Sequence, residues 1–422
     1  MKRFFALTTL ALISGSLTVA ADDWPQYRGP HHDGTSAEKL VSKRWGTPRA
    51  LWKTDAYPLG FASFTSVGDT VYTVCARDEK EILVAVNAGS GKQRWAFTIG
   101  DTDYGNGGGN AGTRDNKGGD GPRSTPTVVD GKVYAISANL GLFCVDARSG
   151  RKLWSHDLLK EFSGVNIKWE NAASPLVDGD LLFMAGGGKG QALLAFNKDS
   201  GKVVWKTQDD LMTHSTPVVA DIHGVRQVVF FTQTGLVACE VKTGKVLWRY
   251  DFKFAVSTAI TPIVAGSTVY CSAGYGVGSA AVEVRPNFTV NELWRIVGHK
   301  DVANHWSTPV HKDGYLYGMF SFKKYGDGPL KCVELKTGKV MWEHEGFGPG
   351  NCILVDGSIL SLSDDGHVVL AEATPAAYKE QSRFKAIGGK CWTTPILANG
   401  RIYVRSTTEA ACFDVSGRTA RR

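Results

Sequence analysis

Nine residues that could bind a ligand stand at the start of repeated phrases along the chain, most of them shortly before a Ser-Pro or Thr-Pro pair. They are Arg123, Glu170, Asn171, His214, His305, Trp306, Asn351, Lys390 and Trp392. Cationic side chains pair with carboxylates, and indole rings stack on flat molecules. Mixed charge together with flat rings therefore predicts a site for a planar anion. The alternative interpretation is that these loop residues are polar because they face water.

Few other groups in the sequence point to chemistry. Glu170 is the carboxylate in these loops that could act as a general base, and with Asn171 it could supply oxygen ligands to Ca²⁺. No motif of serine hydrolases, zinc peptidases or c-type haem attachment is present, so the catalytic residues stay unknown and no metal site is predicted. His31-His32 is interpreted as a surface pair. The Gly-rich insertion from Asp101 to Asp120 is interpreted as a rim loop that could act as a lid.

A repeat positions these residues. Trp residues close successive phrases at spacings of 43 to 59 residues, and they are Trp95, Trp154, Trp205, Trp248, Trp294 and Trp342. Within a phrase, a Ser/Thr-Pro opening is followed by an Asp-Gly turn, and a second turn such as Thr243-Gly244-Lys245 precedes the Trp. Turns that contain Gly between alternating apolar residues are signals of β-hairpins. Each phrase thus predicts four short antiparallel strands, and repeats of this length predict a β-propeller.

The number of phrases predicts an all-β fold with eight four-stranded blades. Units open near Phe64, Thr125, Ser174, Thr216, Thr261, Thr308, Asn351 and Thr394. The seventh unit lacks its Trp, and Phe384 is predicted to occupy that place. The eighth unit stops after three strands, and Ala50–Lys53 supplies a strand of the missing type, so this N-terminal strand would close the ring and cover its free edges. Seven blades are the alternative if the seventh unit is not a blade.

Composition and charge narrow the class of protein. The chain has 422 residues, of which 43% are hydrophobic, and this excludes a mostly disordered chain. The net charge of +7 is spread along the sequence, which argues against nucleic-acid binding. Four of the eight cysteines occupy one position of the repeat, and equivalent positions on neighbouring sheets lie about 10 Å apart, too far for a disulfide. We therefore expect buried thiols there.

The N-terminal region predicts export. A short positive start is followed by an apolar stretch and small residues, and signal-peptide cleavage fits equally well after Ala20 or Ala21. The expected parts are a signal peptide at 1–21, an N-terminal segment at 22–49, a propeller at 50–417 and a disordered basic tail at 418–422. No cysteine stands at the cleavage site to carry a lipid anchor, and no later stretch is apolar enough to span a membrane. We expect a soluble monomer, periplasmic or extracellular.

The repeated phrase resembles the pyrroloquinoline quinone (PQQ)-like propeller repeat, whose mark is Leu-x-Ala-h-Asp-x-x-Thr-Gly-Lys-x-x-Trp, with h apolar. Residues 50–417 carry the resemblance, for example in the stretch from Leu330 to Trp342. The family includes quinoprotein alcohol dehydrogenases, which use PQQ and Ca²⁺, and the outer-membrane protein assembly scaffold, a non-enzymatic propeller. The phrase from Trp24 to Pro30 (WPQYRGP) is most similar to a third group, exported propellers of unassigned function.

The chain lacks several residues on which the functions of these relatives depend. The chain lacks the adjacent cysteine pair that packs on the quinone in the dehydrogenases, and no Asp can be assigned as their catalytic base by motif. It also lacks the cysteine that anchors the assembly scaffold. We therefore expect a binding or interaction module for a small ligand or an envelope protein partner. The alternative is a PQQ- and Ca²⁺-dependent dehydrogenase with its site in the central funnel.

Overall fold

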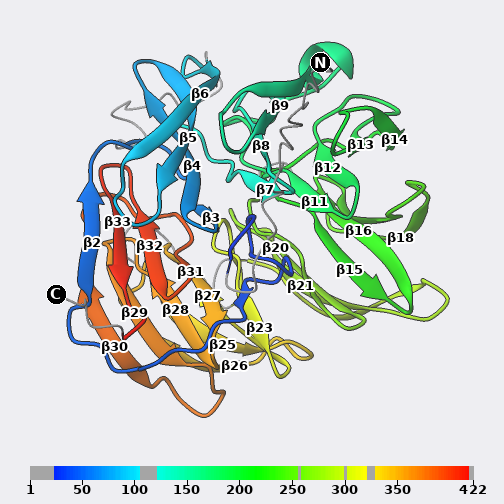
Figure 1. The fold of residues 1–422 in the computed structure, drawn as a ribbon. Helices are drawn as coiled ribbons and strands as arrows, with labels where there is room; N and C mark the ends of the chain where they lie inside the picture. The colour runs from blue at the N-terminus through cyan, green and yellow to red at the C-terminus, as the bar shows by residue number, and fades with distance from the viewer. Residues whose placement is uncertain (1–22, 105–120, 255–257, 299–301, 321–327, 418–422) are drawn as a thin grey trace, which may run out of the picture.

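The computed structural model describes residues 23–104, 121–254, 258–298, 302–320 and 328–417. These residues form a ring of eight sheets around a central axis, which confirms the predicted eight-bladed propeller (Figure 1). The first strand of each blade faces the axis, where first strands of neighbouring blades contact one another. The expected signal peptide, most of the Gly-rich insertion and the basic tail lie outside the described residues.

The first four blades are four-stranded meanders. Blade 1 comprises β3 (Thr65–Val67), β4 (Thr70–Arg77), β5 (Lys80–Asn87) and β6 (Gln93–Asp101). Blade 2 comprises β7 (Thr127–Val129), β8 (Lys132–Ile136), β9 (Gly141–Asp146) and β10 (Lys152–Asp157), and the short helix α1 (Leu158–Glu161) follows it. Blade 3 comprises β11 (Leu176–Asp178), β12 (Leu181–Ala185), β13 (Leu193–Asn197) and β14 (Val203–Thr207). Blade 4 comprises β15 (Val218–Ile222), β16 (Val225–Thr232), β17 (Gly235–Glu240) and β18 (Val246–Asp251).

The last four blades complete the ring, and two of them take a strand from the N-terminal region. Blade 5 comprises β19 (Ile263–Ala265), β20 (Thr268–Ala273), β21 (Gly278–Val284) and β22 (Val290–Ile296). Blade 6 comprises β23 (Val310–Lys312), β24 (Tyr315–Met319), β25 (Leu330–Glu334) and β26 (Val340–His344). Blade 7 comprises β27 (Asn351–Val355), β28 (Ser358–Leu362), β29 (His367–Glu372) and β30 (Glu380–Lys385), with β1 (Thr35–Ser36) added to β27. Blade 8 comprises β31 (Ile396–Ala398), β32 (Arg401–Arg405), β33 (Ala410–Asp414) and β2 (Arg49–Thr54).

The Trp and Gly of the repeat hold consecutive blades together at contacts that we term seams. In blade 3, Trp205 Nε1 donates a hydrogen bond to the Val241 carbonyl of blade 4 at 2.9 Å. Gly244, in the last hairpin turn of blade 4, lies against the Trp205 ring: its φ is +71°, and a Cβ there would be 2.6 Å from the ring. The same pairing joins Trp52 with Gly91, Trp95 with Gly150, Trp154 with Gly201 and Trp294 with Gly338. The repeat therefore encodes the packing between blades as well as the turns within them.

The ring closes through the N-terminal strand, as predicted. β2 pairs antiparallel with β33, and Figure 1 shows these two strands, blue and red, side by side. Trp52 of β2 lies opposite Cys412, at the register position that the closing Trp holds in other blades. Its Nε1 donates to the Ala88 carbonyl of blade 1 at 2.9 Å, so the last seam has the same form as the regular ones.

The prediction that Phe384 replaces the missing Trp of blade 7 is wrong. Ser382 holds that position, because it lies opposite Leu370 just before the register shift, as Trp205 lies opposite Ala195 in blade 3. Phe384 stands two residues further along and packs on Phe413, with ring centroids 5.0 Å apart. Residues two apart in a strand share one face, so the apolar pattern did not distinguish the two positions.

The N-terminal segment packs into the ring. Trp24 forms a backbone bridge with β3 of blade 1, and β1 extends blade 7 in parallel. The buried Arg28 guanidinium donates to the Thr308 and Pro309 carbonyls near β23 of blade 6, at 3.1 and 2.7 Å. His32, expected at the surface, is only 7% exposed, because this segment packs against the inner strands of several blades, with contacts to blades 1, 2, 3 and 6. His31 is exposed, as expected.

The eight cysteines are all buried and none forms a disulfide, in agreement with the thiols expected from the repeat. The apolar core consists of clusters that lie between neighbouring blades, as expected when strands alternate two buried faces. In the part of the chain that the structure describes, no helix has the length and apolar character needed to cross a membrane.

Candidate functional site

Loops that join one blade to the next surround a cavity of about 230 Å³, which is termed the funnel. Six of the nine residues singled out in the sequence line it: Arg123, His214, His305, Trp306, Asn351 and Trp392. Tyr27, from the N-terminal segment, lines it as well, so this segment also contributes to the funnel wall. The loops carry these side chains because each one leads into the first strand of a blade, next to the axis.

A continuous series of six rings runs along the funnel wall. From Trp169 the neighbouring ring centroids are 6.2 Å apart to Tyr275, 4.6 Å to His305, 4.6 Å to Trp306, 4.5 Å to Trp392 and 4.8 Å to Phe61. This series is termed the aromatic arc. Aromatic rings contribute large apolar area and favourable ring–ring contacts, so the arc is a ready surface for a flat or apolar group.

The charge in the funnel comes from Arg123. Its guanidinium donates a hydrogen bond to the Trp169 carbonyl at 2.6 Å, which holds the positive group beside the arc. Burial lowers the pKa of His214 and of His305 to about 3, so both imidazoles are neutral at pH 7. Arg123 adds to the lowering at His214 by repelling the protonated ring. Burial raises the pKa of Glu170 and of Glu81, and the nearby charge of Arg123 opposes this rise, so these two carboxyl groups lie close enough to interact with the guanidinium.

The other three predicted residues do not line the funnel. The Glu170 carboxylate accepts a hydrogen bond from Asn166 Nδ2 at 2.6 Å, and burial raises its pKa. Asn171 is fully buried, and its amide braces the Ser124 hydroxyl and the Ala173 backbone. Lys390 places its ammonium over the Trp392 ring, 4.6 Å from the centroid. These three residues stand in the predicted loops, but their side chains contact the residues around the funnel and do not line the cavity.

Several lining residues were missed from the sequence. Trp169 is adjacent to Glu170, so its loop position was a usable signal. Phe61 precedes the first complete unit, and Tyr275 lies in the turn between β20 and β21, on the outer side of the predicted loops. Tyr27 belongs to the N-terminal segment. These three stand outside the phrase that the repeat analysis aligned.

Arg405 positions one end of the aromatic arc. It is fully buried, and its guanidinium donates to the carbonyls of Ala62, Val74 and Leu59 at 2.8, 2.8 and 2.7 Å. Burial lowers its pKa to about 10, so the group still carries its charge at pH 7. These bonds fix the loop that carries Phe61 in its place against Trp392.

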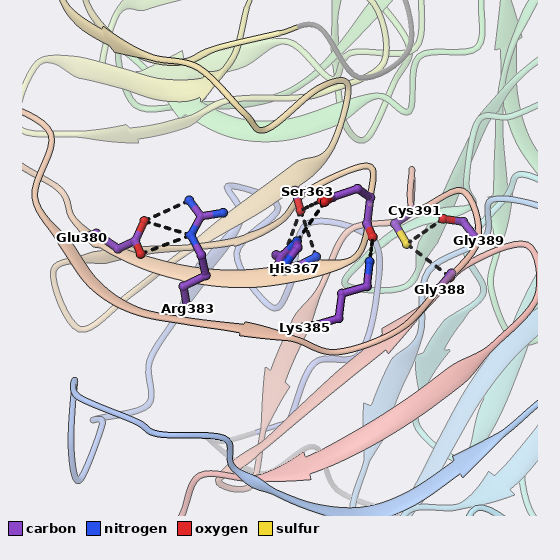
Figure 2. A network of polar contacts seen from close by, with 9 residues as sticks. Ser363, His367, Glu380, Arg383, Lys385, Gly388, Gly389 and Cys391 are labelled. Carbon is purple, nitrogen blue, oxygen red and sulfur yellow. Dashed lines mark hydrogen bonds and ion pairs between the residues drawn. The ribbon is translucent and has the colours of Figure 1, made fainter.

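Polar contacts after blade 7 hold the turn that precedes Trp392. Figure 2 shows Cys391 directed at the Gly388 and Gly389 carbonyls, with Sγ–O distances of 3.7 and 3.6 Å. The His367 backbone N–H donates to Ser363 Oγ at 2.9 Å in the neighbouring turn. Burial raises the pKa of Cys391 to about 12, so its thiol stays protonated and acts as a structural donor.

The residues present do not fit Ca²⁺, the metal that the family resemblance implies. Glu170 and Asn171, the oxygen donors considered for it, are engaged by Asn166 and by the neighbouring backbone. Across the described ranges, no group of three or more His, Cys, Asp and Glu is placed to hold a metal ion.

The fold and its repeats define the class: an eight-bladed propeller built from PQQ-like units. A family model described as outer membrane protein assembly factor BamB matches residues 46–173 and 79–344. The chain belongs to this family.

Individual relatives are similar over part of the chain. Outer membrane protein assembly factor BamB of Shewanella oneidensis is 30% identical over 259 residues, which cover 58% of this chain and 62% of that protein. Quinoprotein alcohol dehydrogenase PedH of Pseudomonas putida is also 30% identical, but over 30% of this chain and 22% of that protein. The crystal structure of quinohemoprotein alcohol dehydrogenase from Comamonas testosteroni matches with a TM-score of 0.68 at 12% identity, covering 94% of this chain and 81% of that one. This last likeness concerns the fold alone.

Proposed function

We propose that this chain is an exported binding module of the cell envelope that holds a partner protein at the mouth of the funnel. The observation that carries the proposal is the aromatic arc, which is open to solvent at one end, where Tyr275 is 54% exposed. Trp, Tyr and Arg are enriched among the few residues that dominate the binding energy at protein interfaces, and the funnel combines all three.

The loops that carry lining residues also expose apolar side chains. Val165, Leu211 and Val297 are 48%, 45% and 74% exposed, and each stands in a blade-joining loop that also carries a lining residue. Apolar side chains gathered at the surface are typical of interaction sites. A rim of this kind suits the surface of a protein that covers the funnel mouth.

Family membership supports a partner in the envelope, because the matching model is described by an outer membrane protein assembly factor. The predicted signal peptide supports export. The alternative dehydrogenase function has less support, because Glu170 and Asn171, the oxygen ligands considered for Ca²⁺, do not line the funnel and accept hydrogen bonds from Asn166 and from the Ala173 backbone instead.

Site-specific photo-crosslinking in the native host tests this function. A photoreactive residue at Val165, on the rim, should give a discrete adduct with an envelope protein. The same residue at Val204, which is 46% exposed on the outer strand of blade 3, is the matched control and should give none. Adding Trp306→Ala to the Val165 variant should lower the adduct yield by about tenfold or more. Equal adduct patterns at Val165 and Val204 would contradict the proposal.

A further inference from the structure

A second cavity, of about 620 Å³, lies at the end of the central axis opposite the funnel. The first strands of the blades run from one to the other: Thr216 lines the funnel, whereas Ala220, further along in β15, lines the second cavity. The N-terminal segment forms the other wall, through Gln26 and residues 30–33. This cavity is termed the basal cavity, and its volume lies within the range of roughly 300–1,000 Å³ that is typical of ligand sites.

The N-terminal segment shows what the free edge of a first strand binds. In an antiparallel pair, every second residue turns its main-chain N–H and C=O away from the partner strand. In a first strand this residue faces the axis, and it is termed the inner-edge residue. The N–H of Ser66 in β3 donates to the Trp24 carbonyl, and the Ser66 carbonyl accepts from the Trp24 N–H, both at 2.8 Å. The N–H of Val128 in β7 donates to the Pro25 carbonyl at 2.7 Å.

The same pattern continues in blades 3 and 7. The N–H of Val177 in β11 donates to Gln26 Oε1 at 3.5 Å, and that of Leu354 in β27 donates to the Gly34 carbonyl at 2.9 Å. The N-terminal segment therefore binds the inner edges of blades 1, 2, 3 and 7.

The inner edges of blades 4 and 5 are open. Val219 in β15 and Val264 in β19 hold the inner-edge register, because each stands three residues after the Thr that opens its unit, as Val128 stands after Thr125. Both residues line the basal cavity. Within the described residues, no main-chain group bonds to theirs from the side of the axis. An uncovered strand edge is a template for another extended chain.

Charge selects the side chains of such a chain. The Asp and Arg residues that line the basal cavity are Asp33, Asp130, Asp178 and Arg226. The Arg226 guanidinium is shared between the carboxylates of Asp178 and Asp221. Lys198 pairs with Asp130 at 3.3 Å, and its ammonium is shared with two further carboxylates at 3.2 and 3.9 Å. Each of these cations faces more than one carboxylate, so the wall keeps a negative charge.

Two histidines of the cavity do not offset this charge. Burial lowers the pKa of His32 to about 4, and it also lowers the pKa of His311, so both rings are neutral at pH 7. An incoming cation therefore meets net attraction from the wall, and an incoming anion meets net repulsion.

We propose that the inner edges of blades 4 and 5 bind an extended segment of a partner protein that carries a Lys or Arg side chain. The main chain of this segment pairs with Val219 and Val264, as the N-terminal segment pairs with the other blades, and its cation lies near the carboxylates of the wall. Because the basal cavity and the funnel lie at opposite ends of the axis, this site does not rest on the docking proposed at the funnel mouth.

Selection of phage-displayed random hexapeptides on the immobilised, purified protein tests the site. Enriched peptides should contain Lys or Arg at least about threefold more often than Asp or Glu. Since a strand edge bonds every second residue, methylation of the peptide amides in one alternating register should weaken binding by about tenfold, and methylation in the other register should not. A selection that enriches no peptide, or enriches acidic ones, would overturn the proposal.

Variants locate the binding of these peptides. Val264→Pro removes the N–H that faces the axis and spares the hydrogen bonds to β20, so it should weaken binding by about tenfold. Val264→Ala keeps this N–H, is the matched control and should retain binding. If Val264→Pro does not fold, Ala220→Arg, which adds a cation to the cavity wall, should show the same loss, with Val204→Arg on the outer strand of blade 3 as its control. Unchanged binding in these variants would overturn the proposal.

Two further results would identify a different occupant or site. Peptide binding that is lost in Trp306→Ala and retained in Ala220→Arg lies in the funnel, and it would overturn the basal site. A wild-type dimer in sedimentation that Ala220→Arg dissociates would overturn the partner protein in favour of a second copy of this chain. Crosslinking at Val165 tests the funnel docking independently of both results.

Discussion

The seam between blades 3 and 4 and the seam between blades 7 and 8 meet the same packing requirement with different residues. At the first, the Trp205 ring covers Gly244 of the next blade. At the second, Ser382 stands at the Trp position, and the N-terminal segment fills the space. Ser382 Oγ accepts from the Trp45 backbone N–H at 2.6 Å and donates to the Lys43 carbonyl at 2.9 Å.

Several smaller contacts replace the missing Trp. Leu40 and Trp45 pack against the apolar cluster of blades 7, 8 and 1. The Glu38 carboxylate accepts the Gly400 backbone N–H of blade 8 at 2.8 Å, and Lys39 pairs with a carboxylate of blade 7 at 3.1 Å. A seam therefore requires filled volume and satisfied polar groups, and a segment outside the repeat can supply both.

Removal of the N-terminal region should destabilise the protein most. This region supplies both the closing strand β2 and the contacts that replace the missing Trp of blade 7. A chain that starts at Asp55 lacks the closing strand β2 with Trp52, and it should show no cooperative thermal unfolding transition. A chain that starts at Arg49 keeps β2 and is the control: it should fold with a lower Tm, because it loses the buried contacts of Trp24 and Arg28. A wild-type Tm for the shorter chain would contradict closure by β2.

Trp205→Ala should have the next largest effect, since it empties a regular seam. Loss of this buried ring, which is 8% exposed, should lower the free energy of unfolding by about 3–5 kcal/mol. Urea denaturation measures this change. Val204→Ala on the same strand removes an exposed side chain and should change the free energy by less than about 0.5 kcal/mol. Equal costs for the two variants would show that the Trp does not hold the seam.

Ser382→Ala should have the smallest effect of the three, because it removes two hydrogen bonds and little volume. We expect a loss of about 1–2 kcal/mol in the free energy of unfolding. Ser361→Ala in the same blade is the matched control, because its hydroxyl is buried with no partner among the described residues, and the change should be neutral or stabilising. A neutral Ser382→Ala would show that the N-terminal segment docks without this residue.

The regular part of the fold could be predicted because it repeats. A Gly in a tight turn followed by a closing Trp, as in Gly244 and Trp248, occurs often enough in the sequence to reveal the blades, and the unpaired strand near Trp52 revealed the closure. The docking of the N-terminal segment could not be predicted, since its contacts at Arg28 and Trp45 join residues hundreds of positions apart and occur once each.

The candidate site was predictable in part for the same reason. The repeat placed Arg123, His305 and Trp392 in loops at one end of the axis, and the structure brings them to the funnel. It did not give the direction of each side chain, so Glu170 and Asn171 were included although they point into the surrounding structure. The Ser and Thr residues that open the first four units were visible in the sequence, but the hydrogen bonds that their hydroxyl oxygens accept from neighbouring blades were not.

The pairing of β2 with β33 also sets an order of events during folding. The two strands lie near opposite ends of the described chain, so this pairing has the longest sequence separation of the strand pairings and forms slowly compared with the hairpins of each blade. Until β33 has formed, β2 has no partner strand, and the row of folded blades has two open edges. Such edges attract other chains, so the interval before closure is the time at which this protein is most exposed to aggregation and most dependent on chaperones.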